Sequence, residues 1–243
     1  MKRVYGRDEQ GRRYCQLDGQ FKWMGTNGPM WGTLTMSIDM TDVDLFRKKL
    51  QKESRIHITI TSPIIKAAAN ASAVVPIIGG VWLNADRIWV ADPGEILVWG
   101  AVQVGDQLGI YRIENAGKKS LLEISGELNT QVNEARSKKK IVMLEDLPPK
   151  VPSLGVSNVG TIGPVEAATL EFNEPHHVGG NVAGLLAIGA ILEKPAVKDG
   201  KIQIRKLMNA ILFWDHTVMM ANTPIEFLNE LKKSLEEPDT YLV

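Results

Sequence analysis

The sequence predicts one α+β domain, in which helices pack on a largely antiparallel or mixed sheet. Two observations lead to this fold class. Segments that alternate apolar and polar residues, as strands do, are interspersed with segments that repeat apolar residues every three or four positions, as helices do. These segments follow one another without the regular strand–helix–strand rhythm of a parallel sheet, and no internal repeat or low-complexity linker separates them.

The N-terminal part is expected to be irregular before the first regular element. Residues 1–32 are rich in glycine, arginine and glutamine, and they predict an irregular arm. The alternation of residues 33–41 predicts a strand, and Thr41 or Asp42 can cap the short helix "DVDLFRKKLQKE" that follows. Residues 55–61, "RIHITIT", alternate again and indicate a second strand.

The middle of the chain contains two predicted helices and a hairpin between them. Ser62, with Pro63 at the first helical position, marks the start of a helix that continues through "IIKAAANASAVV". "EILVWGAVQVGDQLGIYRI" consists of two apolar runs around Gly105 and Asp106, which predict a hairpin. "KSLLEISGELNTQVNEARSKKK" has helical periodicity and ends in basic residues, as the C-terminus of a helix favours.

The final third predicts more strands and a last helix. "LGVSNVG" indicates a strand of small residues and a turn. "VAGLLAIGAILEK" and "KDGKIQIRKLMNAILFWDH" predict two long strands joined at Asp199 and Gly200. The helix "TPIEFLNELKKSLEE" is expected to begin with a capping box, with Thr223 as the N-cap and Glu226 as the third residue.

Composition excludes several classes of partner. The 28 basic and 28 acidic residues give a formal net charge of zero, which argues against nucleic acid or an anionic membrane as the main partner. Cys15 is the one cysteine, so no internal disulfide can form. No apolar run reaches the roughly 18 residues of a membrane helix, and the charged start is unlike a signal peptide. We therefore expect a soluble cytoplasmic protein.

Five segments carry a resemblance to a known family. In order along the chain they are "ITSPIIKAAANASAVVP", "ENAGKKSLLEISGELNTQVNEARSKK", "LGVSNVGTIG", "FNEPHH" and "FWDHTVMMA". Over about residues 33–243 they resemble the catalytic domain of the 2-oxo acid dehydrogenase acyltransferases, the E2 components, which has the chloramphenicol acetyltransferase fold. The collinear order of the matches carries the resemblance, which implies the same fold for this chain.

The resemblance also implies an activity and an assembly. Such enzymes move an acyl group between a dihydrolipoyl thiol and coenzyme A. His216, in the segment similar to the family's "DHRxxDG" motif, would be the general base that takes the proton from the attacking thiol. Ser157 would donate its hydroxyl to the oxyanion of the tetrahedral intermediate. The family implies a homotrimer or an assembly of trimers, with the histidine and the serine of each site on neighbouring subunits.

The chain is expected to be a catalytic core alone, over residues 33–243. No lipoyl domain, lipoylation motif or E1/E3-binding domain is recognisable, so lipoate would not be attached to this chain. Coenzyme A would be a substrate, although the sequence assigns no residue to its binding. Separate lipoyl proteins or E1-like and E3-like components are the candidate partners. No metal is expected, because the pair His176–His177 has no further ligand at a suitable spacing.

The active-site segment departs from the family's motif. Met220 stands four residues after His216, where the family has Asp or Asn, and Ala221 replaces a glycine. Thr217 occupies the position of the motif's arginine. Because a thioether is a feeble acceptor, Met220 cannot hold a charged partner, and Asn222 is the candidate to organise the loop instead.

Three further residues belong to the matched motifs. Asp215 and Asn158 are expected to support the site, although Asn158 also suits a purely structural role. Gly117 stands where the family has an aspartate.

Alternative interpretations remain open at this stage. His216 also fits a hydrogen-bonded core histidine at a strand end, and Ser157 fits a small residue needed for close packing. The substitutions at positions 117, 217 and 220 favour a structural or regulatory core subunit that has lost transfer activity. Met219 and Met220 fit instead a site re-lined for another acyl acceptor, because methionine makes an adaptable apolar wall.

Overall fold

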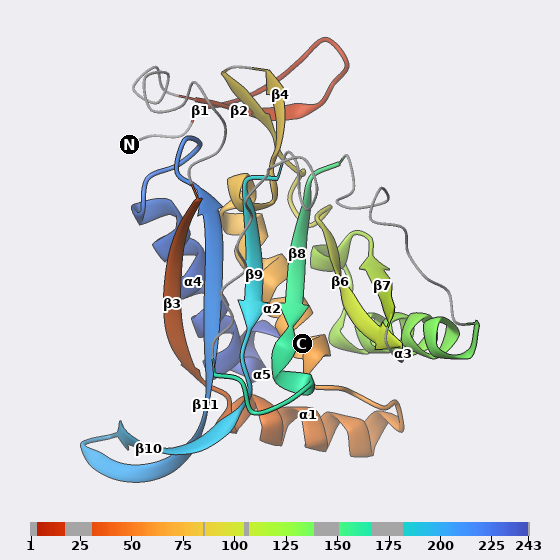
Figure 1. Ribbon diagram of the computed structural model, residues 1–243, viewed down its shortest axis with the longest axis vertical. Helices are drawn as coiled ribbons and strands as arrows, with labels where there is room; N and C mark the ends of the chain where they lie inside the picture. The colour runs from red at the N-terminus through yellow and green to blue at the C-terminus, as the bar shows by residue number, and fades with distance from the viewer. Residues whose placement is uncertain are drawn as a thin grey trace.

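The computed structural model confirms the α+β class. The structure describes residues 4–17, 31–84, 86–104, 107–138, 151–166 and 182–242. The family-like segment "FNEPHH", with the pair His176–His177, lies outside these residues. Figure 1 shows a large sheet with helices behind it and a small sheet above one end.

The large sheet is mixed, as the sequence predicted. Its strand order is β10-β11-β9-β8-β6-β7, and β3 also pairs with β11. β8 is parallel to both β6 and β9, whereas the other pairs are antiparallel. The strands are β3 (Trp31–Asp39), β6 (Leu97–Val104), β7 (Gln107–Ile113), β8 (Ser153–Asn158), β9 (Gly184–Ile188), β10 (Leu192–Lys198) and β11 (Lys201–Asp215).

The four long helices of the described ranges lie within a residue or two of their predicted positions, whereas the short C-terminal helix and the 3-10 turns were not predicted. They are α1 (Thr41–Ser54), α2 (Thr61–Val74), α3 (Leu121–Lys138), α4 (Asn222–Glu236) and α5 (Pro238–Tyr241), with 3-10 turns η2 (Pro76–Gly79), η3 (Ala116–Lys118) and η5 (Val159–Thr161). The helix α4 begins one residue before the expected cap Thr223. Among the described residues, every helix is too short or too polar to traverse a lipid bilayer.

The two faces of the large sheet bury different sets of side chains. Successive residues of a strand point to opposite faces, so each strand contributes to both. Leu154, Val156, Leu186 and Leu212 belong to the main core, which they share with the helices. Trp99, Leu185, Ala187, Ile211 and Phe213 form a second cluster, against which Trp31 packs. By the same alternation Ser157 lies on the face of this second cluster, and Asn158 on the helix-covered face.

Residues 4–16 are more regular than the predicted irregular arm. β1 (Val4–Arg7) and β2 (Arg13–Gln16) form a hairpin, which joins β5 (Arg87–Trp89) and β4 (Val81–Asn84) in a four-stranded sheet of order β1-β2-β5-β4. Cys15 is buried between the hairpin and the main core.

The strand predicted at residues 55–61 is wrong. Residues 55–60 belong to no strand, although Ile58 is fully buried as the alternation suggested. Side chains of α1 take the place of a neighbouring strand: Gln51 Oε1 accepts from the Ile58 N–H at 2.9 Å, and Arg47 donates to the Ile58 carbonyl at 2.7 Å. These two hydrogen bonds satisfy the backbone N–H and C=O of Ile58 without a neighbouring strand.

The long hairpin at Asp199 and Gly200 is confirmed, with one interruption. Both residues have positive φ, 52° and 73°, which a two-residue hairpin of this hand requires. The first strand is divided at residues 189–191 into β9 and β10, and the register against β11 shifts there by one residue. The Ala190 N–H turns away to donate to the Val165 carbonyl at 2.6 Å, which takes the segment out of the ladder.

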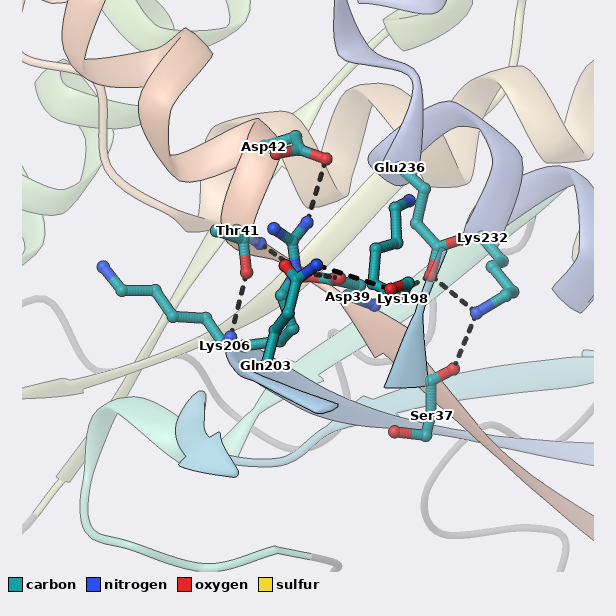
Figure 2. A network of polar contacts seen from close by, with 10 residues as sticks. Ser37, Asp39, Thr41, Asp42, Lys198, Gln203, Lys206, Lys232 and Glu236 are labelled. Atoms are coloured by element: carbon teal, nitrogen blue, oxygen red, sulfur yellow. Dashed lines mark hydrogen bonds and ion pairs between the residues drawn. The ribbon is translucent and has the colours of Figure 1, made fainter. Parts of the chain in front are cut away.

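An ion-pair network joins this hairpin to the helices (Figure 2). Arg205 contacts Asp39 at 2.6 Å and Asp42 at 3.1 Å, so it links β11 to β3 and α1. Glu236 of α4 accepts from the Asp39 N–H at 2.9 Å and from Lys232 at 2.6 Å. The network therefore fixes the N-terminal part of β11, and His216 follows the C-terminal end of the same strand.

Asp44 of α1 is the most strongly paired carboxylate in this region. It contacts Arg47 at 2.5 Å, Lys48 at 2.9 Å and Lys206 at 2.6 Å. Burial disfavours its charged form, but the hydrogen bonds from these three cations outweigh burial and hold the pKa of Asp44 well below its usual range. Because the folded-state pKa is the lower one, this stabilisation is complete above the unfolded pKa and is lost as the pH falls through the folded pKa.

The Asp44→Asn variant is expected to lose about 2 kcal/mol of unfolding free energy near pH 7, because the cations lose their anionic partner. The difference from wild type should shrink as the pH falls below about 4, because the carboxyl then becomes protonated in the unfolded state while the ion pairs keep it charged in the folded state. Urea unfolding at a fixed protein concentration measures both effects. Asp42→Asn is the control: its carboxylate is 46% exposed with one 3.1 Å contact, so a change within about 0.5 kcal/mol is expected. A loss in Asp44→Asn that does not vary with pH would contradict this account.

Candidate active site

His216 lies in the tight turn that follows β11. The N–H groups of Val218 and Met219 donate to the Asp215 carbonyl at 3.0 and 3.3 Å, which reverses the chain directly after the strand. The half-buried imidazole ring packs against Trp214, with 5.8 Å between ring centroids and 36° between the planes. Its Nδ1 atom is buried and has no hydrogen-bond partner among the described residues. In the part of the chain that the structure describes, the hydrogen-bonding capacity of the ring is therefore incompletely used.

Asp215 has all its polar groups engaged, in contrast to His216. It is 2% exposed. Its Oδ1 accepts from the N–H of Thr217 at 2.9 Å and from the Thr217 hydroxyl at 2.6 Å, and its Oδ2 accepts from the indole N–H of Trp82 at 3.4 Å. Its own N–H donates to the Ala183 carbonyl at 2.9 Å. Asp215 therefore stabilises the turn that carries His216, and its supporting role in the site stays a prediction.

Ser157 lies near the end of β8 and is half-buried. It pairs with Ala187 of β9, on the sheet face that bears the second hydrophobic cluster. A cavity of about 350 Å³ opens at the same end of the sheet, with Asn158 and Ile64 in its wall. Because Asn158 and Ser157 point to opposite faces, this cavity is on the helix-covered side and is not the space that Ser157 faces.

His216 and Ser157 lie far apart within one chain. Trp214 is level with Gly184 of β9, whereas Ser157 is level with Ala187, so the two levels differ by three residues or about 10 Å. β9 lies between β11 and β8, which adds about 10 Å across the strands. The imidazole and the hydroxyl are therefore on the order of 15 Å apart, well beyond the reach of one reacting group.

Within the described residues, neither of the two other predicted supporting residues is hydrogen-bonded to His216. Asn158 donates from Nδ2 to the Thr61 hydroxyl at 3.1 Å, which ties the end of β8 to the start of α2. This contact fits the structural role considered for Asn158. Asn222 is exposed at the first position of α4, and no hydrogen bond in the described part of the chain joins it to His216.

The methionines after His216 have separate environments. Met219 is 3% exposed and belongs to the main core, so it does not line an open site. Met220, at the family's acidic position, is 47% exposed. The adaptable wall of two adjacent methionines suggested by the sequence is thus not formed by this chain alone.

Gly117, which stands where the family has an aspartate, lies beside Lys66. Lys66 is 7% exposed and donates to the Gly117 carbonyl at 3.1 Å. Burial lowers the pKa of Lys66, and the nearby charge of Glu123 offsets this in part. A Cβ atom at position 117 would lie 2.6 Å from the Cα of Gly94, so the backbones touch here.

Sequence reasoning missed two contributors to this region, Thr217 and Trp82. Thr217 was seen as the loss of an arginine, whereas it supplies two hydrogen bonds to Asp215. An Asp followed two residues later by Thr is a turn signal that could have been recognised. Trp82 is 133 residues from Asp215 in sequence, and no local pattern pairs them. In the described ranges, no group of three or more His, Cys, Asp or Glu side chains is placed to hold a metal ion.

Solved structures define the class of fold. A dihydrolipoamide acetyltransferase of Azotobacter vinelandii, studied for the roles of one serine, one histidine and one asparagine in its catalytic mechanism, gives a TM-score of 0.73 at 22% identity and covers 92% of this chain and 87% of its own. A chloramphenicol acetyltransferase gives 0.57 at 11% identity, over 84% of this chain and 88% of its own. The mixed sheet backed by helices, with a histidine in the turn after the longest strand, is therefore of the chloramphenicol acetyltransferase-like class.

Sequence comparison defines the family. Residues 29–243 match the sequence model of the 2-oxoacid dehydrogenases acyltransferase (catalytic domain), and the chain belongs to this family. The acetyltransferase component of the pyruvate dehydrogenase complex of Bacillus subtilis (strain 168) is 26% identical over 215 residues, which are 87% of this chain and 46% of that protein. The chain thus spans about half the length of the curated relatives it matches.

Proposed function

We propose that this chain transfers an acyl group between a dihydrolipoyl thiol and coenzyme A, in a homotrimer or an assembly of trimers. The observation that carries the proposal is the position of the two candidate catalytic groups. His216 and Ser157 lie about 15 Å apart within one chain, so a site that uses both needs each from a different subunit. The relatives support the reaction class, because they include acetyltransferase and succinyltransferase components of 2-oxo acid dehydrogenase complexes.

In the proposed reaction His216 is the general base. One ring nitrogen accepts the proton of the attacking thiol as its sulfur adds to the thioester carbonyl of the donor. The tetrahedral intermediate carries a negative oxygen, to which the Ser157 hydroxyl of a neighbouring subunit donates a hydrogen bond. The intermediate collapses with loss of the donor thiolate, which takes the proton back from the imidazolium. The histidine therefore ends each cycle in its starting state.

The lipoyl group is proposed to reside on a separate protein or domain, with coenzyme A as the second substrate. E1-like and E3-like components are the corresponding proposed partners. The bacterial relatives act on different acyl groups, acetyl, succinyl and branched-chain, at 24–27% identity to this chain.

A direct assay tests the proposal. The purified protein is incubated with dihydrolipoamide and, in turn, acetyl-CoA, succinyl-CoA and isobutyryl-CoA. Free coenzyme A is measured by chromatography, without a thiol reagent. Acyl-lipoamide and coenzyme A should appear in equal amounts with at least one donor. No product above the protein-free rate with any of the three donors would contradict the proposal.

A structural or regulatory core without transfer activity is the second candidate. Two observations favour it: Met220 stands exposed at the family's acidic position, and Nδ1 of His216 lacks a partner in the described chain. This candidate predicts trimers that have no affinity for coenzyme A. Sedimentation analysis and calorimetric titration with coenzyme A separate the two candidates, because binding in the micromolar range would exclude the inactive core.

A further inference from the structure

The Asp215 side chain closes a ring around His216. Its Oδ1 accepts from the N–H of Thr217, two residues on, at 2.9 Å. This is the pattern of an Asx turn, in which a side-chain oxygen replaces the first carbonyl of a backbone turn. His216 is the residue enclosed between the two partners. The direction in which its side chain leaves the backbone therefore depends on the Asp215 carboxylate.

Two further donors fix that carboxylate. The Thr217 hydroxyl donates to the same oxygen at 2.6 Å, and the Trp82 indole N–H donates to the other oxygen at 3.4 Å. No lysine or arginine among the described residues forms an ion pair with Asp215. A buried carboxylate without a cation depends on such neutral donors, so each hydrogen bond to it is worth more than an average one.

Backbone contacts attach this turn to the small sheet that carries Trp82. The Ala183 N–H donates to the Gly80 carbonyl at 2.9 Å, and the Asp215 N–H donates to the Ala183 carbonyl at 2.9 Å. Val81 forms an isolated bridge with Val182. Trp82 follows Val81 in β4 and so reaches Asp215 from a strand that is hydrogen-bonded to the same segment. These backbone contacts fix the position of β4, and with it that of Trp82, relative to Asp215.

We propose that Thr217 and Trp82 are positioning residues, which act through Asp215 to fix the orientation of the His216 ring. The change from the family's arginine to Thr217 then preserves the turn by neutral hydrogen bonds. The kinetic part of this inference rests on the proposed function, whereas its chemical-labelling part does not.

Two variants each remove one donor, Thr217→Val with little change in shape and Trp82→Phe with the loss of part of the ring system. Thr217→Val deletes the hydroxyl, and Trp82→Phe deletes the indole N–H. With the acyl donor identified in the transfer assay, kcat should fall about tenfold in each variant, while KM for coenzyme A stays within about twofold. Thr217→Ser retains a hydroxyl and should restore most of the rate. Trp89→Phe changes a tryptophan of the adjacent strand β5 and should leave kcat unchanged.

Labelling by diethyl pyrocarbonate tests ring positioning without any activity. The rate of modification of His216, read from peptide mass spectra relative to the exposed His57, should rise several-fold in Thr217→Val and Trp82→Phe but not in Trp89→Phe. Unchanged kcat and unchanged labelling in Thr217→Val and Trp82→Phe would overturn the inference. If one of them fails to fold in thermal melts, the other decides.

The two proposals fail in different ways. A wild-type protein that transfers no acyl group contradicts the proposed function, and the labelling rates still decide whether Thr217 and Trp82 position the ring. A wild-type protein that is active, with variants of equal kcat and equal labelling rates, contradicts the positioning role alone.

Discussion

His216→Ala is expected to reduce acyl transfer by about 10²- to 10⁴-fold, through kcat, with little change in KM for coenzyme A. The imidazole in the turn after β11 is the group proposed to take the thiol proton. Without it the thiol must react in its protonated form or ionise into water near neutral pH. Steady-state kinetics with dihydrolipoamide and the best acyl-CoA donor measure the change.

His57→Ala is the matched control for this loss. His57 is exposed in the segment before α2, and it is the backbone carbonyl, not the ring, that accepts a hydrogen bond from Asn129 at 2.6 Å. The variant should therefore transfer acyl groups at the wild-type rate. Equal activity of His216→Ala and wild type would remove His216 from the mechanism. An equal fall in both histidine variants would point to a general effect of losing an imidazole.

Mixed trimers of two inactive variants are expected to recover about a third of the wild-type rate. Ser157→Ala keeps the base and loses the oxyanion donor, and His216→Ala does the reverse. In a closed ring of three, each site combines the histidine of one chain with the serine of the next. A trimer with both kinds of chain, in either ratio, then has one complete site of three.

Co-expression with two different affinity tags and tandem purification isolates these mixed trimers. Each variant alone, purified in the same way, should be nearly inactive, because removal of an oxyanion donor alone costs about 10²- to 10³-fold. Mixed trimers no more active than the single variants would contradict a site shared between subunits. The separation of about 15 Å within one chain would then leave Ser157 without a catalytic role.

The parts of the fold that the sequence predicted well are those with a local cause. The two positive φ angles at Asp199 and Gly200 suit a hairpin, and Asp-Gly announces one. The strand predicted at residues 55–61 is absent because an alternating pattern indicates which residues are buried, and not whether they pair with another strand. Ile58 is buried as expected, but Arg47 and Gln51 bind its peptide groups, and nothing in the local pattern distinguishes these partners from a strand.

The sequence predicted which motif residues belong to the candidate site, but not which side chains contact one another there. His216 and Asp215 could be located from the family resemblance. That resemblance presents Thr217 as a defect, because it compares side chains one position at a time. The structure shows that Thr217 satisfies the neighbouring carboxylate, and that Trp82 contributes from another sheet. Contacts of this kind depend on how distant segments meet, which spacing along the chain does not encode.

The contact between Gly94 and Gly117 constrains how this chain can evolve. An aspartate at position 117, as in the family, would bring its Cβ to 2.6 Å from the Gly94 Cα, and backbone cannot move aside as a flexible side chain can. Gly94 itself has φ of +78°, a conformation that side chains disfavour. A side chain at position 117 therefore requires the backbone around Gly94 to shift, and a carboxylate beside Lys66 would need that change as well.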